Sequence, residues 1–130
     1  MKAINSNLHR CVTPLFVAVL LSACTTPQQG TNDSGVRQRT DLEHRSLTSA
    51  FANLGNETAY DNISRASDLG GEFYTPINAR FPPDAPASRG ILIREVRWQR
   101  DNHWIAAFST RHEGAWIVFD AVEWHKDVVF

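Results

Sequence analysis

The spacing of hydrophobic residues changes along the chain and divides it into segments of different predicted structure. From residue 47, apolar side chains recur at intervals of three and four residues, which is the spacing of one helix face. They are Leu47, Ala50, Phe51 and Leu54. Thr40 and Glu43 have the spacing of a capping box, and Gly55 follows the last apolar position. The pattern predicts a helix over 41–54.

A second helical pattern is weaker and leads into a segment rich in proline. Tyr60 and Ile63 fall on one helix face, and Gly70-Gly71 would end the helix, which predicts a helix over 58–69. The next segment, 70–90, holds Pro76, Pro82, Pro83 and Pro86. It predicts a long irregular connection, with Glu72–Tyr74 as a candidate short strand. Four apolar residues should fix it to the core: Phe73, Tyr74, Ile77 and Phe81.

From Ile91 onward the chain is rich in Ile, Val, Phe and Trp, and short polar turns interrupt it. This pattern predicts β-strands joined by hairpins over Ile91–Arg100, Trp104–Arg111 and Ala115–Trp124, with Val128–Phe130 as a short fourth piece. The predicted fold class is therefore α+β, with two N-terminal helices followed by a three-stranded antiparallel β-meander.

The predicted register has a consequence for the four tryptophans. If both hairpin turns have three residues, Trp98 pairs with Ala106 and Phe108 pairs with Val118. Trp98, Trp104, Trp116 and Trp124 then lie on one face of the sheet. Such a face is either core or a ligand or partner surface, because large aromatic side chains dominate both. The opposite face is also apolar in two strands, so the 70–90 segment, a second copy or a partner should cover it.

Asp120 is the one acidic residue within the apolar stripe of the third predicted strand. A buried carboxylate is costly unless it is paired. In the predicted register Asp120 lies across from Ala106, on the same face as Arg94 and Arg100. We expect it to be paired with an arginine or a backbone donor, and a pocket carboxylate acting as acid or base is the alternative.

The N-terminal residues have the pattern of an export signal. Lys2 and Arg10 precede a short apolar stretch over 12–21, and Leu21-Ser22-Ala23-Cys24 follows. This tetrapeptide resembles the lipobox of bacterial lipoproteins. The resemblance implies a signal peptide over 1–23, cleavage before Cys24, and lipid on its sulfur that would anchor the protein. Thr25 in place of Asp implies the outer membrane, on its periplasmic side.

The remaining residues divide into a tether and a domain. Residues 24–39 comprise Cys24 and a polar stretch that predicts a flexible tether. Residues 40–130 are predicted to form a single small α+β domain. Hydrophobic residues make up 42% of the chain and the formal net charge is −1. This composition excludes a disordered chain, and the charge argues against nucleic-acid binding.

The sequence contains no motif for catalysis or for a cofactor. None of the histidines has the spacing of a metal site, and there is no glycine-rich phosphate loop and no Ser or Cys nucleophile motif. We therefore expect neither a metal nor another cofactor, and no enzymatic activity. The expected partners are the membrane, through Cys24, and an envelope protein.

Two family resemblances bear on function. The predicted order of two helices and three strands is similar to that of the small α-α-β-β-β lipoproteins, such as the one in the barrel-assembly machinery, which implies a non-catalytic binding or assembly role. The Gly-Met-Thr and Leu-Gly-x-Pro signatures of that family are absent, so no site residues transfer. The alternative is a SnoaL-like α+β cone, because Gly114–Asp120 resembles a terminal strand of that family. It implies a pocket that binds small molecules or acts on them as an enzyme, and Asp120 would then lie in it.

Overall fold

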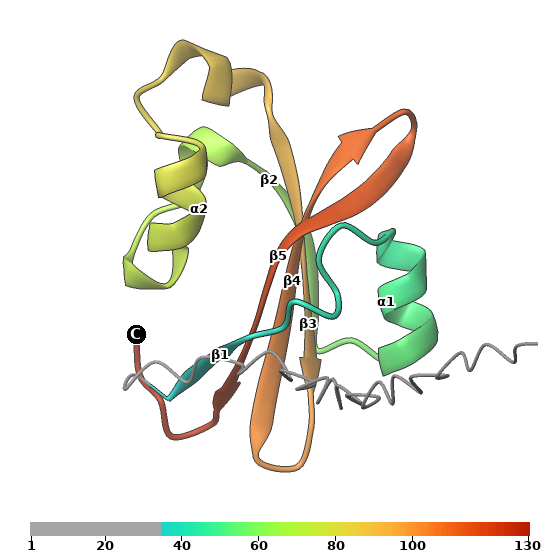
Figure 1. Cartoon of the computed structure of the whole chain (residues 1–130). Coiled ribbons are helices and arrows are strands. Elements are labelled where there is room, and N and C mark those ends of the chain that lie inside the picture. The colour runs from blue at the N-terminus through green and yellow to red at the C-terminus, as the bar shows by residue number, and fades with distance from the viewer. Residues whose placement is uncertain (1–34) are drawn as a thin grey trace, which may run out of the picture.

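The structure is a computed structural model that describes residues 35–130. Within this range the chain forms one antiparallel sheet of five strands in the order β1-β5-β4-β3-β2 (Figure 1). The strands are β1 (Val36–Gln38), β2 (Tyr60–Arg65), β3 (Leu92–Gln99), β4 (His103–His112) and β5 (Ala115–His125). The helices are α1 (Leu47–Leu54) and α2 (Thr75–Arg80). Three 3₁₀ turns are η1 (Ala66–Asp68), η2 (Glu72–Tyr74) and η3 (Pro86–Gly90).

The predicted fold class is wrong. In the described part of the chain the sheet dominates, and the two short helices do not form an N-terminal pair. Helix α1 follows β1 and carries the chain across one face of the sheet, whereas α2 lies between β2 and β3 on the other face (Figure 1). The three predicted strands are present and antiparallel, but they form the inner part of a larger sheet that β1 and β2 complete.

Helix α1 begins later than predicted because the residues before it bond to β5. The backbone N–H of His44 donates to Val118 O at 2.8 Å, and Val118 N–H donates to Arg45 O at 2.9 Å. These bonds hold the backbone outside the helix, and Thr40 therefore caps nothing. Ser46 is the N-cap instead, and its side chain accepts from Ser49 N–H at 3.2 Å.

The helix predicted over 58–69 is also wrong, since strand β2 occupies most of this range. Tyr60 and Ile63, assigned to one helix face, project from opposite faces of the sheet, opposite Arg97 and Arg94. Five of the six residues of β2 are solvent-exposed. Because β2 buries so few side chains, its apolar positions are compatible with either a helix or a strand. Its backbone pairing with β3 makes it a strand.

The segment before β3 is more regular than predicted, with η2 and α2 in place of a loop or a short strand. The prediction that four of its apolar residues fix it to the core is confirmed. Ile77 is buried, and the other three pack against the same cluster: Phe73, Tyr74 and Phe81. This segment covers the second face of the sheet.

The predicted register is wrong in both hairpins. In the β3–β4 hairpin four residues separate the last paired positions, Gln99 and Trp104, so Trp98 pairs with Ile105 instead of Ala106. The β4–β5 turn has two residues, Glu113 and Gly114, both with positive φ, as a type I′ turn requires. This turn is one residue shorter than the predicted three-residue turn.

A β-bulge at Phe119 changes the side-chain direction within β5. Phe108 pairs with Asp120 but the next residue, Ser109, pairs with Val118, so Phe119 is the extra residue. As a result Trp116 packs on the α1 side of the sheet and Trp124 on the α2 side. The four tryptophans therefore divide equally between the faces, Trp98 and Trp116 on one and Trp104 and Trp124 on the other.

Two apolar clusters result, one on each face. Under α1 the cluster includes Leu47 and Ala50 from the helix and Val96, Trp98 and Val118 from the sheet. Under α2 the cluster includes the helix residue Ile77 and the sheet residues listed next. These are Ile93, Ala106, Phe108, Phe119, Val122 and Trp124.

Strand β1 lies inside the range predicted as a tether. Val36–Gln38 pair with β5, so the folded part of the chain already includes these residues. The signal peptide over 1–23, Cys24 and the tether as far as residue 34 lie outside the described residues. Among residues 35–130 no helix has the length and hydropathy needed to cross a membrane.

The start of α1 can be tested by comparing two substitutions. Ser46→Ala removes the cap and should lower the free energy of unfolding by about 1 kcal/mol. Thr40→Ala, the matched control at the position predicted from sequence, should change it by no more than about 0.5 kcal/mol. Urea unfolding measures both. The reverse order would place the helix start at residue 40 and contradict the structure.

Candidate functional site

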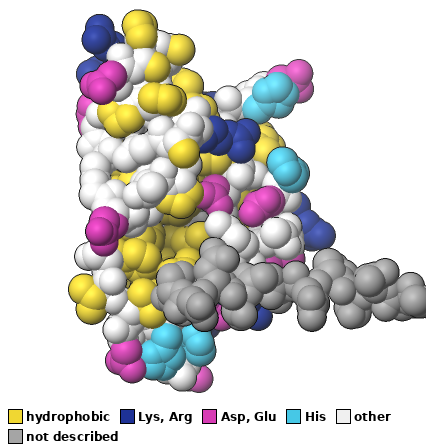
Figure 2. Space-filling view, turned by 60° about the vertical axis from the view of Figure 1, so that its left-hand side comes forward, with side chains coloured by type: hydrophobic (Ala, Val, Ile, Leu, Met, Phe, Trp, Pro, Cys, Tyr) yellow, Lys and Arg dark blue, Asp and Glu magenta, His cyan; other side chains and the backbone are white. Residues whose placement is uncertain are grey.

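The cavity whose lining is richest in aromatic side chains lies between η2, the paired ends of β4 and β5, and the residues after β5. Its volume is about 440 Å³, within the range of small-ligand sites. Its aromatic walls are Phe73, Tyr74, Trp104, Trp124 and Phe130, and its cations are Arg97 and Lys126. Figure 2 shows hydrophobic side chains gathered on this side of the molecule. We refer to it as the aromatic pocket.

The pairing of β4 with β5 builds the floor of the aromatic pocket. Trp104 and Trp124 are direct cross-strand partners, and their rings stack with centroids 6.5 Å apart and an interplanar angle of 19°. Phe73 meets Trp124 edge-on at 5.2 Å. Phe130 contacts both Phe73, at 4.9 Å, and Trp124, at 5.6 Å. Three segments distant in sequence therefore fix the shape of one aromatic wall.

A buried carboxylate stands behind the aromatic pocket. Glu95 is only 3% exposed, and it accepts hydrogen bonds from the Arg97 guanidinium and, at 2.9 Å, from the Tyr74 hydroxyl. Arg97 also donates to the Tyr74 hydroxyl oxygen at 3.3 Å. Because Glu95 and Arg97 are two residues apart on β3, they project from the same face of the sheet. The ion pair and the phenol thus satisfy a carboxylate that would be costly to bury alone.

The same network fixes Arg97 between two aromatic rings. Its guanidinium carbon lies 4.6 Å from the centroid of Phe73 and 4.9 Å from that of Tyr60. Burial, together with the charge of Glu95, raises the pKa of Tyr74 to about 12. The phenol is therefore protonated at neutral pH and donates its hydrogen bond to the carboxylate.

Charge at the rim of the aromatic pocket comes from Lys126. Its ammonium group donates to the backbone carbonyl of Asp101, which brings no opposing charge. The charge of Arg97 is balanced by Glu95. The side chains that line the pocket thus combine a large apolar surface with two cations. Arg97 is already paired with a carboxylate, so Lys126 is the cation that favours a ligand with an apolar body and an acidic group.

Phe130 forms part of a second cavity as well. A smaller pocket of about 260 Å³ adjoins Phe73 and Phe130 from the side of β1 and α2 and includes Gln38 and Thr75. Since Phe130 lines both cavities, its ring is part of the boundary between them.

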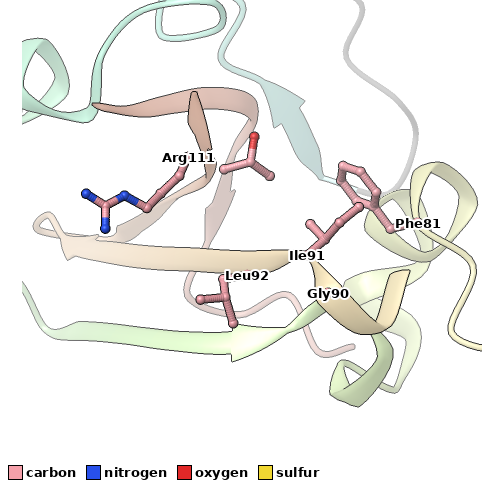
Figure 3. A pocket seen from close by; sticks show the side chains of 6 residues that line it. Phe81, Gly90, Ile91, Leu92 and Arg111 are labelled. Carbon is pink, nitrogen blue, oxygen red and sulfur yellow. The ribbon is translucent and has the colours of Figure 1, made fainter. Parts of the chain in front are cut away.

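Another cavity, of about 360 Å³, lies at the opposite end of the sheet, near the start of β3. Phe81 and Ile91 lie side by side there, whereas Leu92 points to the other side of its strand and Arg111 points away (Figure 3). Its side chains do not converge on one point, so it offers less for recognition than the aromatic pocket.

The structure does not place Asp120 where it was predicted. Asp120 lies opposite Phe108 instead of Ala106, and the two arginines predicted as partners bond elsewhere. Arg94 pairs with Asp61, at 2.7 Å, and Arg100 donates to Leu54 O. The neighbour of Asp120 is Gln38, whose amide nitrogen, oriented toward it, donates to Oδ1 at 3.1 Å.

Burial and the nearby carboxylate of Glu43 raise the pKa of Asp120, while the Ala121 backbone N–H and Arg80 act against that shift. Asp120 does not line the aromatic pocket. It lies four residues from Trp124 on β5, or about 13 Å along an extended strand. The pocket carboxylate expected for a SnoaL-like cone is therefore not part of this cavity.

The four tryptophans predicted on one face do not form a single surface, because two pack in the core under α1 and two line the aromatic pocket. Trp98 is completely buried, meets Phe51 edge-on at 5.4 Å, and donates from Nε1 to Gly55 O at 2.9 Å. Trp116 packs beside the same cluster, with the Arg111 guanidinium over its ring. Of the four candidates, only Trp104 and Trp124 come together in a pocket.

Sequence reasoning missed the polar residues of this site. Glu95 and Arg97 were predicted only as polar positions of the first strand, on the face that the 70–90 segment, a second copy or a partner should cover, and no role was assigned to them. The available signal was that Ile93, on the same face, and the apolar residues of the next two strands would place them beside a core. Tyr74 was predicted only as an anchor for the segment, and its hydrogen bond to Glu95 is visible only in three dimensions.

The described residues hold no group of three or more His, Cys, Asp or Glu side chains that could bind a metal ion. His103 and His125 are cross-strand neighbours with ring centroids 5.3 Å apart, and His125 Nδ1 lies 3.1 Å from Asp127. This pair lies where β4 begins and β5 ends, next to Trp104 and Trp124 but outside the lining of the aromatic pocket.

Comparison with known proteins found no matching family model, no similar curated protein and no similar solved structure. The function must therefore be argued from the lipobox resemblance and from the geometry of the aromatic pocket.

The buried hydrogen bond of Tyr74 predicts a loss of stability in alkali. The pKa of Tyr74 is raised in the folded protein, so its contribution is present below pH 10 and is lost as the pH rises toward about 12. In a spectrophotometric titration, one of the chain's two tyrosines should ionise only near this upper value or on unfolding. Tyr74→Phe should abolish that late step, and a late step that persists in the variant would contradict the assignment.

Proposed function

We propose that this chain is a lipid-anchored protein of the bacterial envelope that binds a ligand in its aromatic pocket and performs no chemistry on it. The observation that carries the binding role is the stacked pair Trp104 and Trp124 beside the cation Lys126. The anchoring role rests on the lipobox resemblance of Leu21–Cys24 and on its implied location at the periplasmic side of the outer membrane.

The chemistry of the aromatic pocket defines the ligand class. The stacked indoles and Phe73 favour a flat, apolar body, because aromatic surfaces bury large areas with defined geometry. Lys126 favours one acidic substituent at the rim. The ion pair between Arg97 and Glu95 contributes orientation with little net charge. The proposed ligand is a cyclic apolar compound, or an equivalent group of an envelope partner, that carries a single acid.

A non-catalytic role is favoured by the arrangement of the titratable groups. The carboxylate that bonds to two of the lining residues, Glu95, is held by Arg97 and Tyr74, and Tyr74 has a pKa raised to about 12. A general acid or base needs a pKa near the working pH and access to the substrate. Asp120 lies outside the aromatic pocket, which weighs against the SnoaL-like enzyme alternative.

A pair of fluorescent probes tests the ligand class. Anilinonaphthalene sulfonate has a flat apolar body and one acid, and N-phenyl-1-naphthylamine has the same body without it. We expect saturable binding of both, with Lys126→Gln weakening only the sulfonate. Trp104→Ala should weaken both probes by about tenfold or more, while Trp116→Ala, on the other face, should change neither.

Near-ultraviolet circular dichroism provides the folding control for these variants, because partly unfolded proteins also bind such dyes. If folded Trp104→Ala binds both probes as well as the parent chain does, the aromatic pocket is not the binding site. If Lys126→Gln weakens the two probes equally, the acidic group is not part of the ligand class.

Anchoring is tested separately through Cys24. In a Gram-negative host, the parent chain should sediment with membranes and carry acyl chains on Cys24, whereas Cys24→Ser should remain unacylated. Mass spectrometry of the N-terminal peptide and membrane fractionation measure both properties. Cys11→Ser is the matched control and should be processed normally. An unacylated Cys24 in the parent chain would contradict the anchoring proposal and leave the pocket proposal unaffected.

A further inference from the structure

Strand β2 forms an open edge of the sheet. It pairs with β3 on one side, and within the described residues no strand lies on its other side. Ala66 N–H donates to Ile91 O at 2.9 Å, which fixes the alternation of the antiparallel ladder. The even-numbered residues of β2 bond to β3, so the backbone groups of Asp61, Ile63 and Arg65 are directed outward.

This edge lacks two of the usual protections against pairing. Its sequence, Tyr-Asp-Asn-Ile-Ser-Arg, contains neither proline nor lysine. Ile63 is 50% exposed at its centre, and Leu92, beside it on the same face, is 46% exposed. An exposed edge strand with a central apolar residue is a template for another strand.

The sequence of β2 is complementary to itself in one antiparallel register. If Ile63 of one copy lies opposite Ile63 of the other, then Asp61 lies opposite Arg65, and Asn62 lies opposite Ser64. This register pairs all three outward-directed residues and allows about six hydrogen bonds between the chains. Opposite charges meet at both ends, the exposed isoleucines meet at the two-fold axis, and no like charges face each other.

Neighbouring registers lack this complementarity. A shift by two residues places Asp61 or Arg65 opposite Ile63 and leaves fewer outward-directed groups paired. A shift by one residue brings together backbone groups that cannot bond, because the ladder alternates. The charges on the edge therefore select one partner strand and one register.

We propose that β2 is the dimer interface of this protein, and that two copies join their sheets edge to edge about a two-fold axis at Ile63. Asp61 already accepts two hydrogen bonds from Arg94, at 2.7 and 2.9 Å. In the dimer it lies between Arg94 of its own chain and Arg65 of the second copy. The proposal uses residues distant from the aromatic pocket and does not depend on the proposed ligand.

Cysteine cross-linking of the full chain in its native membrane tests the geometry. Ile63→Cys should give a homodimer with a short thiol-specific cross-linker, because the two positions are directly opposite. Leu92→Cys, on the same face and about as exposed, is one strand further from the axis and should react only weakly. The unsubstituted chain provides the background for its own cysteines. Equal yields at the two positions, or a product whose mass is not that of two chains, would overturn the proposal.

Charge reversal in detergent-solubilised protein tests the register. Arg65→Glu should raise the dimer dissociation constant by about tenfold or more, because it faces Asp61 of the second copy. The triple variant Asp61→Arg, Arg65→Glu, Arg94→Glu reverses every charge of this cluster and should restore dimerisation, while Val129→Lys, away from the edge, should leave it unchanged. Sedimentation equilibrium measures association, and thermal melting confirms that each variant is folded. A monomeric parent chain, or a folded Arg65→Glu variant that associates like the parent, would contradict the proposal.

Discussion

Both faces of the two central strands are apolar, and this constraint determines the arrangement of every other element. Five consecutive residues of β4, from Ile105 to Ser109, are buried, so neither face can remain in contact with water. An antiparallel sheet usually exposes one face, but this one requires two covers. Helix α1 provides one cover, and the segment containing η2 and α2 provides the other.

The bulge at Phe119 allows β5 to contribute to both clusters. Without the extra residue, Trp116, Val118, Val122 and Trp124 would share one face, because side chains alternate with a period of two. With the extra residue, the two ends of β5 direct their large side chains to opposite faces of the sheet, one covered by α1 and the other by the segment containing η2 and α2. Trp124 thereby reaches Trp104 and Phe73, and the wall of the aromatic pocket is a direct result of this one irregularity.

The buried network of Glu95, Arg97 and Tyr74 links the second cover to the sheet. Each member depends on the others, because the carboxylate is stable in the interior only with its donors and the phenol remains protonated there. The network fixes η2 above β3 and so defines the opening of the aromatic pocket. Ion pairs join each edge strand to the sheet as well, because Arg37 and Arg39 pair with Glu123 beside β1, and Asp61 of β2 pairs with Arg94 of β3.

The sequence by itself determined the local features that depend on neighbours in the chain. These are the three strands of the meander, the apolar stripe and glycine end of α1, and the anchoring residues of the 70–90 segment. Tertiary structure alone decided the start of α1, the identity of β2, the register of both hairpins and the positions of Glu95 and Asp120. The physical reason is that backbone hydrogen bonds to a distant strand replace local ones. A shift of one residue, or one bulge, then moves a side chain to the opposite face without changing the periodicity that sequence reasoning uses.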